Sequence, residues 1–302
     1  MRLILPALLG LCAATAHAQT PVVDATSFLN TRLYNDGSLL LEHVDVVFAP
    51  ESPANASIRI EQANGAELAR YPLAGEYRMR DKAFGRLPVS GHARWQAPAS
   101  GDYRMVVNIG GADVTQFPFS VTLKTSGDPF DPATTALFDG PWRELGYLVT
   151  REQSGNTFFD LVAWVGAIDL PEGQSKGQSI ARLMRGGKEI GHSRESGGHI
   201  DNSMPYKPAT YGFLVPHESR RAHEARPIAL ADLADGNYEI RVERSDSQRL
   251  RSFPFSVKNG AIQPHPRGTL THTPRERMLS PRVYRKGGNY AFQEAFWLIG
   301  TR

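Results

Sequence analysis

The sequence predicts an all-β protein made of two tandem antiparallel β-sandwiches, followed by a basic segment and a β-hairpin. Three observations support this prediction: the chain contains an internal two-fold repeat, its apolar residues occur in short alternating runs, and no long stretch has helical periodicity. Clusters of Gly, Pro, Asn and Asp separate the runs, as expected for the short strands and turns of a sandwich. Because 41% of the 302 residues are hydrophobic, the chain can bury two domain cores and disorder is not indicated.

Residues 1–18 have the pattern of a secretory signal peptide. A positive start precedes the apolar run Leu3 to Ala14 and the small-x-small sequence Ala16 to Ala18, after which cleavage is expected. The apolar run is shorter than the roughly 20 residues that a transmembrane helix needs, and Leu11 before Cys12 does not fit a lipoprotein signal. We therefore expect a periplasmic or secreted protein without a transmembrane segment after signal removal. Since Cys12 is the only cysteine, we expect no disulfide.

The repeat defines the two predicted sandwiches, residues 19–125 and 140–259, joined by a proline-stiffened linker, residues 126–139. In each sandwich a Gly-x-Tyr sequence opens an alternating strand, and a Phe-Pro-Phe-Ser-Val sequence follows it. The matching segments are Tyr103 to Val107 with Phe117 to Val121, and Tyr238 to Val242 with Phe253 to Val257. Because proline cannot donate to a β-ladder, we expect Pro118 and Pro254 to lie at a sheet edge or where the strand changes sheet.

Other parts of the two units also correspond. Ile58 to Leu68 and Ile180 to Ile190 both read as strand, Gly turn and strand. The irregular stretch 191–227 replaces a shorter segment of the first unit and is expected to be a long loop. Residues 281–298 follow the opening plan of each unit, which suggests a third, incomplete copy.

The closing pattern of each unit resembles bacterial extracellular immunoglobulin-like and fibronectin-type modules. The residues that carry this resemblance run from Trp95 through Gly101-Asp102-Tyr103 to Val107, and from Leu233 through Gly236-Asn237-Tyr238 onward. The resemblance implies that both sandwiches are immunoglobulin-like. Such modules serve adhesion, carbohydrate binding, chaperoning and spacing, so the fold alone does not select a function.

Residues 260–302 form a basic, proline-rich segment with a terminal hairpin. The chain has a net charge of +3, but the stretch from Lys258 to the end holds eight Lys and Arg against two acids, so the basic character is local. Guanidinium groups suit bidentate contacts to phosphate or carboxylate. The candidate binding residues are Arg267, Arg275, Arg277, Arg282, Arg285, Lys286, Tyr290 and Trp297. A solvated linker whose arginines pair with the acidic body is the equally simple alternative.

The terminal hairpin, from Val283 to Leu298, is rich in aromatic residues. An isolated two-stranded hairpin is marginal in water, so its aromatic side chains need a surface. They can pack on a sandwich of the same chain, which we favour, or extend a sheet of a partner by strand addition.

Four histidines in the 191–227 stretch raise the question of a metal site: His192, His199, His217 and His223. No HExxH pattern, no compact His pair and no cysteine ligand accompanies them, so they are weak metal candidates and no cofactor is expected. No nucleophile elbow or phosphate-binding loop is present. Asp160 and Asp169 flank an apolar strand, where acidic residues are usually ordinary turn residues. We therefore expect a protein without catalytic residues.

The sequence thus favours a non-enzymatic periplasmic or secreted binding or assembly protein of the cell envelope. Its partner would be an envelope protein, an anionic polysaccharide or a lipid head group, and no nucleic acid is expected because no fold that reads one is indicated. Two alternatives remain: a hydrolase or metal-dependent accessory enzyme with its site in the 191–227 loop, and a periplasmic chaperone.

Overall fold

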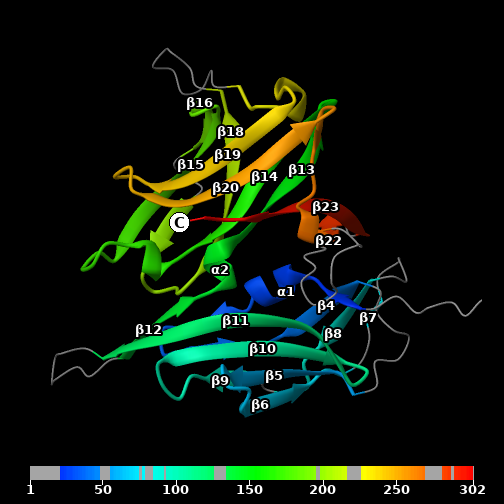
Figure 1. Ribbon diagram of the computed structural model, residues 1–302, viewed down its shortest axis with the longest axis vertical. Coiled ribbons are helices and arrows are strands. Elements are labelled where there is room, and N and C mark those ends of the chain that lie inside the picture. Colours follow the sequence, from blue (N-terminus) through cyan, green and yellow to red (C-terminus); the bar gives the residue numbers. More distant parts are fainter. Residues whose placement is uncertain are drawn as a thin grey trace, which may run out of the picture.

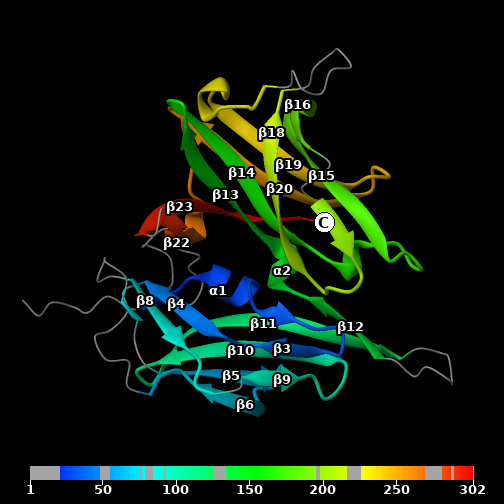
Figure 2. The ribbon, with the colours of Figure 1, turned by 180° about the vertical axis from the view of Figure 1, so that it is seen from behind.

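The computed structural model describes residues 21–47, 55–74, 77–78, 84–91, 93–125, 134–194, 198–215, 226–268, 281–286 and 289–301. In this part of the chain nearly all of the secondary structure is β, and the sheets are antiparallel, which confirms the prediction of an all-β protein. The strands form two lobes. The short helices α1 (Ala25–Leu29) and α2 (Pro141–Glu144) lie between the lobes in both views (Figures 1 and 2).

The described residues of the first lobe form a four-stranded, a five-stranded and a three-stranded sheet, in the orders β1-β4-β8-β7, β12-β11-β10-β5-β6 and β2-β3-β9. Their strands are β1 (Val22–Val23), β2 (Arg32–Leu33), β3 (Ser38–Leu40), β4 (His43–Val47), β5 (Ser57–Gln62), β6 (Glu67–Pro72), β7 (Tyr77–Arg78), β8 (Phe84–Pro88), β9 (Arg94–Gln96), β10 (Gly101–Ile109), β11 (Ala112–Thr125) and β12 (Thr134–Asp139).

The second lobe is one eleven-stranded sheet that curls into a near-barrel, in the order β21-β20-β19-β15-β16-β18-β14-β13-β23-β22 with β17 paired to β15. The strands are β13 (Leu145–Gln153), β14 (Asn156–Val165), β15 (Lys176–Arg185), β16 (Lys188–Ser193), β17 (Gly198–Asp201), β18 (Lys207–Leu214), β19 (Gly236–Arg244), β20 (Arg249–Lys258), β21 (Ala261–Ile262), β22 (Pro281–Lys286) and β23 (Asn289–Ile299). Among the described residues the connections include the 3-10 turns η1 (Ala167–Asp169), η4 (Leu230–Asp232) and η5 (Pro266–Gly268).

The two predicted repeats share their strand register. Tyr103 lies opposite Phe119 in the β10–β11 pair, and Tyr238 lies opposite Phe255 in the β19–β20 pair. The register shifts four residues after each tyrosine, at Val107 and at Val242. Both phenol groups donate a hydrogen bond to a carbonyl four residues upstream, at 2.6 Å in the first lobe and 2.5 Å in the second. The sequence repeat is therefore a repeat of structure.

Two stretches differ from their sequence-based description. Residues 134–139, inside the predicted linker, form β12 and pair with β11. Residues 198–201 and 207–214, inside the predicted long loop, form β17 and β18, and β18 pairs with β14 and β16. Along β18 every second residue is buried, which places Tyr211 and Phe213 in the core. Its Pro208 and Gly212 obscure this alternation in the sequence.

The terminal hairpin packs on the same chain. β22 pairs with β23, and β23 also pairs with β13, from Leu145 opposite Ile299 to Val149 opposite Ala295. Trp297 is 2% exposed, and its ring lies 5.2 Å from that of Tyr147. The hairpin is therefore part of the second lobe's sheet.

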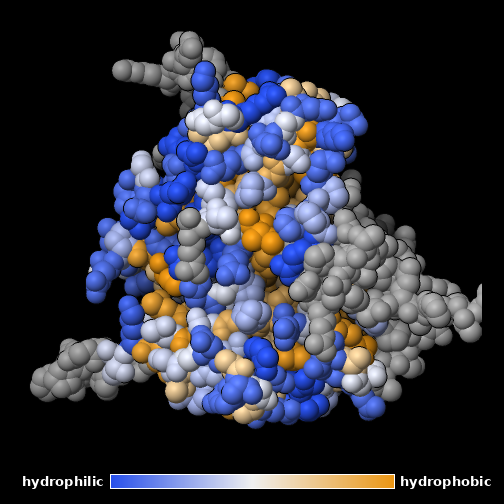
Figure 3. Space-filling model, viewed as in Figure 1, coloured by the Kyte–Doolittle hydropathy of each residue, from blue (hydrophilic) through white to orange (hydrophobic). Residues whose placement is uncertain are grey.

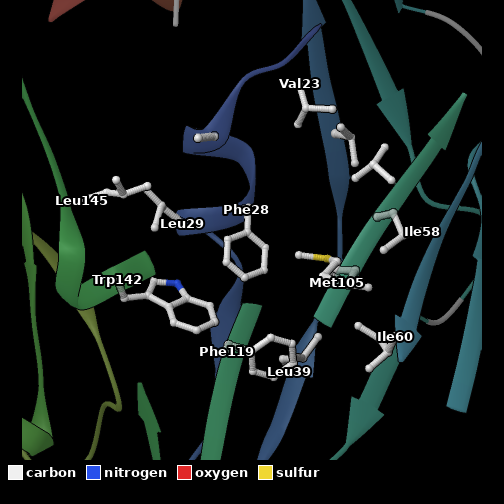
Figure 4. Packing of buried hydrophobic residues seen from close by; sticks show 14 of the residues in the cluster. Val23, Phe28, Leu29, Leu39, Ile58, Ile60, Met105, Phe119, Trp142 and Leu145 are labelled. Atoms are coloured by element: carbon white, nitrogen blue, oxygen red, sulfur yellow. The ribbon is translucent and has the colours of Figure 1, made fainter. Parts of the chain in front are cut away.

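The two lobes meet through apolar side chains. One core cluster joins the first lobe to Tyr147, Val149, Trp164 and Trp297 of the second, and the other fills the near-barrel. β13 and β14 are thus buried on both faces, which explains their nearly continuous apolar sequences. Trp142 of α2 is fully buried among these residues, next to Phe28, Leu29 and Leu145 (Figure 4).

Candidate functional site

The near-barrel has a seam where β20 and the end of β23, each one strand in from an end of the sheet, approach each other. At one end they are joined by two backbone hydrogen bonds of 2.8 Å between Ser252 and Thr301. In an antiparallel ladder the next such pair lies two residues further along each strand, here Pro254 and Ile299. Pro254 has no N–H to donate, so the ladder cannot continue in this register. The seam opens at this point.

The closed end of the seam depends on a small residue. A Cβ atom at Gly300 would lie 2.8 Å from the ring of Phe253 and 3.2 Å from the carbonyl oxygen of Glu144. The Gly300 N–H donates to that oxygen at 2.6 Å. Only glycine lets β23 pass this close to Phe253, which is fully buried. The strands therefore meet at Gly300 and diverge from there.

Past the closed end lies a pocket of about 230 Å³, which we call the seam pocket. β20 bounds it on one side, β23 on another, and the segment that follows β21 on the third. Its lining residues are Asn237, Tyr238, Pro254, Phe255, Ser256, Gln263, Pro264, His265, Pro266, Trp297 and Leu298. Figure 3 shows hydrophobic surface in the middle of this face, where β20 and β23 lie in Figure 1.

The seam pocket has an apolar floor and a mixed rim. Tyr238, Phe255, Trp297 and Leu298 are all buried, and the rings of Tyr238 and Phe255 stack 5.3 Å apart. The rim includes three exposed prolines, at positions 254, 264 and 266, together with amide and imidazole groups. A site of this kind offers an apolar group a place to bury and offers hydrogen bonds at its edge.

Backbone contacts hold the third side of the pocket. The Gln263 N–H donates to the Ser256 carbonyl oxygen at 2.9 Å, and its side chain donates to the Ala261 carbonyl oxygen at 3.0 Å. The turn between β20 and β21 is fixed by Asp235, whose carboxylate accepts from the Asn259 and Gly260 N–H groups. These backbone hydrogen bonds lower the pKa of Asp235, so its carboxylate is charged at neutral pH.

The structure brings two of the sequence-predicted binding residues to the seam pocket. Trp297 lines it, and Arg267 directly follows Pro266, with its N–H donating to His265 Nδ1 at 3.2 Å. The backbone of β22 carries Arg282, Arg285 and Lys286, and Tyr290 of β23 lies opposite Arg285. Arg275 and Arg277 lie outside the described residues.

The candidate metal ligands do not assemble in the part of the chain that the structure describes. His192 of β16 lies 2.9 Å from Glu189 Oε1, and His199 of β17 lies opposite Gln178. His217 and His223 fall in residues 216–225, which are outside the description. Among the described residues no group of three or more His, Cys, Asp or Glu side chains could hold a metal ion.

Sequence reasoning did not identify the residues that open the seam. The sequence does contain a signal for the opening of the seam: the Phe-Pro-Phe sequence around Pro254, which predicts a sheet edge or a change of sheet. What could not be read from the sequence is that Thr301, almost fifty residues away, reaches the same edge.

In the described residues no helix is both long and apolar enough to cross a membrane. Comparison of the chain with protein-family models, curated proteins and solved structures gives no match.

Proposed function

We propose that this chain is a non-enzymatic binding protein of the periplasm or the cell exterior, which holds a protein partner through the seam pocket. The observation that carries the proposal is the opening beside Pro254, with its apolar floor of buried rings. The partner inserts one aromatic or large aliphatic side chain there. Interface energy commonly concentrates in such an anchor and the pocket that excludes water around it.

The size of the pocket favours a single side chain. Pockets for drug-sized ligands are usually about 300 to 1,000 Å³, whereas the seam pocket is about 230 Å³. One ring or one branched aliphatic group fits this space. The remainder of the partner would lie across the exposed rim, where the Gln263 and Asn237 amides offer hydrogen bonds.

The surrounding charge favours an acidic segment of the partner. Arg267 follows the pocket rim in sequence, and the exposed Lys258 ends β20. Opposite charge near an apolar anchor fixes orientation and speeds association. Carboxylates flanking the anchor side chain would meet these groups.

The architecture that we propose for this function is two immunoglobulin-like sandwiches behind a signal peptide of residues 1–18. The paired tyrosine hydrogen bonds at Ala99 and Ala234 support it, because a tyrosine bonded to an upstream carbonyl at the start of a strand is typical of such sandwiches. In this architecture β12 belongs with the first sandwich, because it pairs with β11, and β23 belongs with the second, because it pairs with β13. A secreted module of this kind presents a binding surface without chemistry of its own.

The proposal is tested by blocking the pocket. We would select peptides from a random library on the immobilised protein and measure their affinity by calorimetry. We expect peptides with one aromatic or large aliphatic residue flanked by Asp or Glu, and weaker binding at high salt. Ser256→Trp places a bulky ring at the rim and should weaken binding by about tenfold or more.

Ser120→Trp is the matched control, because Ser120 follows Phe119 as Ser256 follows Phe255 in the shared register. This control should bind the selected peptides like the unmodified protein. Equal affinity of all three proteins for the selected peptides would reject the seam pocket as the binding site.

A further inference from the structure

A second pocket, of about 210 Å³, lies in the first lobe beside α1. In contrast to the seam pocket, its wall is polar almost throughout, and Leu40 is its one apolar side chain among the described lining residues. Asp24, Ser27 and Asn30 come from α1 and its two ends, and His43 and Asp45 come from β4. We call this site the α1 pocket.

The walls of the α1 pocket are fixed before any ligand arrives. Asp24 is 2% exposed, caps α1 by accepting from the Thr26 N–H at 2.9 Å, and donates its own N–H to the Asp45 carbonyl oxygen at 2.8 Å. Asp45 is 7% exposed, and its two carboxylate oxygens accept from Arg86 at 2.7 and 2.9 Å. Helix and strand are thus tied together across the pocket, so little reorganisation is needed on binding.

Three carboxylates, those of Asp24, Glu42 and Asp45, line the pocket with one guanidinium group, and two of the carboxylates are in ion pairs. Arg86 balances Asp45, and Glu42 pairs with Arg32 at 3.0 Å. Burial lowers the pKa of His43 below its usual value of 6.5, against the opposing effect of Asp45, so at neutral pH the imidazole is uncharged. A neutral imidazole offers one donor and one acceptor. The three carboxylates disfavour an anion, and the ion pairs of Asp45 and Glu42 weaken the attraction of the pocket for a cation.

We propose that the α1 pocket binds a neutral polyhydroxylated ligand, such as one sugar residue. Each hydroxyl of such a ligand both donates and accepts, and the pocket offers both kinds of partner: the carboxylates and the Ser27 hydroxyl, which itself donates to the Asp24 carbonyl oxygen, accept, and His43, Asn30 and the Thr hydroxyls do both. The volume suits one ring, and the polar wall excludes an apolar ligand, which would leave buried polar groups unpaired.

Nuclear magnetic resonance titration tests this proposal on the isotope-labelled protein. The probes are glucose, galactose, mannose and N-acetylglucosamine, with ethanolamine as the cation and inorganic phosphate as the anion. We expect at least one sugar to shift the His43 and Asn30 signals in a saturable way. His43→Phe removes both ring nitrogens and should weaken that binding by about tenfold, and Thr31→Val, which removes only a hydroxyl at the rim, should also weaken it.

His192→Phe is the matched control, because His192 lies in the second lobe on β16 and should leave sugar binding unchanged. The absence of a saturable shift with every sugar, or a shift with ethanolamine or phosphate instead, would overturn the proposal. Ser256→Trp should not alter the sugar titration, so this result is independent of the seam pocket.

Discussion

The two repeats place a proline at the same point, and of the two pockets described above Pro254 lines one whereas Pro118 lines neither. Pro118 lies opposite Arg104, and Pro254 lies opposite Glu239, and in each case the next residues along the two strands are a tyrosine and a phenylalanine in contact. In the first repeat β12 pairs with β11 up to Ser120 and the chain then turns at Gly140 into α2. In the second, β21 follows β20 and the chain continues through Pro264 to Pro266.

What the chain does after the proline decides whether the core is closed. A Cβ atom at Gly140 would lie 2.9 Å from the Pro118 carbonyl oxygen, and the backbone φ there is 137°, so only glycine allows this close turn. The turn brings Trp142 onto Phe119, with ring centres 6.0 Å apart. At the second proline the chain does not turn back onto the phenylalanine in this way, and the space beside Phe255 is part of the seam pocket, with Trp297 of β23 in its lining. The same Phe-Pro-Phe motif therefore lies under a covering tryptophan in the first lobe and beside an open pocket in the second.

Removing Trp142 should uncover the core beside Phe119 and so abolish the difference between the two repeats. Of the predicted effects on the free energy of unfolding, this one should be the largest. Trp142→Ala would leave a cavity beside Phe28 and Phe119, because Trp142 is fully buried between the lobes. We expect the free energy of unfolding to fall by about 3 to 5 kcal/mol. Urea denaturation followed by circular dichroism measures it. Trp142→Phe, which keeps a ring, should lose clearly less, and an equal loss for both variants would contradict the role of the cavity.

Replacing Pro254 by a residue with an N–H group should narrow the seam. The effect on the free energy of unfolding should be smaller than that of Trp142→Ala. Pro254→Val supplies a donor towards the Ile299 carbonyl oxygen and should lengthen the Ser252–Thr301 ladder. One added hydrogen bond contributes about 1 kcal/mol, reduced by the extra freedom of the unfolded chain. The hydrogen-exchange rate of the Ile299 amide, compared between the unmodified protein and Pro254→Val, measures the lengthening of the ladder. In the variant the new amide at position 254 should also exchange slowly. Pro118→Val is the control, because α2 already occupies that side, and slower exchange in the control alone would argue against the ladder.

The smallest expected effect is on the pH dependence of the free energy of unfolding, and it comes from His43 in the first lobe. Burial lowers the pKa of His43, with Asp45 and Glu42 raising it and Arg86 lowering it further. Below pH 6.5 the unfolded chain takes up this proton before the folded one does, so the free energy of unfolding falls as the pH drops from 6.5 towards the folded-state pKa. His43→Gln should flatten this part of the profile. Parallel profiles for the unmodified protein and His43→Gln would refute this assignment.

Much of the local structure could be predicted from the sequence. Alternation predicts the strands Tyr103 to Val107 and Tyr238 to Val242, and the repeat predicts that each is followed by a Phe-Pro-Phe strand, with which the structure pairs it. Alternation is a property of neighbouring residues and needs no tertiary context. β18 was missed because Pro208 and Gly212 interrupt the pattern, and β12 because its position after two prolines reads as a linker.

The pockets could not be predicted, because residues distant in sequence form their walls. The seam pocket needs Trp297 beside Phe255, and the α1 pocket needs Asp24 beside Asp45. The buried ion pair of Asp169 and Arg251 joins residues 82 positions apart and likewise has no local signal. By itself the sequence determined the strands, the repeat and the two prolines, since each depends on neighbouring residues. Only the tertiary structure decided which proline is covered, because that depends on where α2 and β23 pack after the sheets have formed.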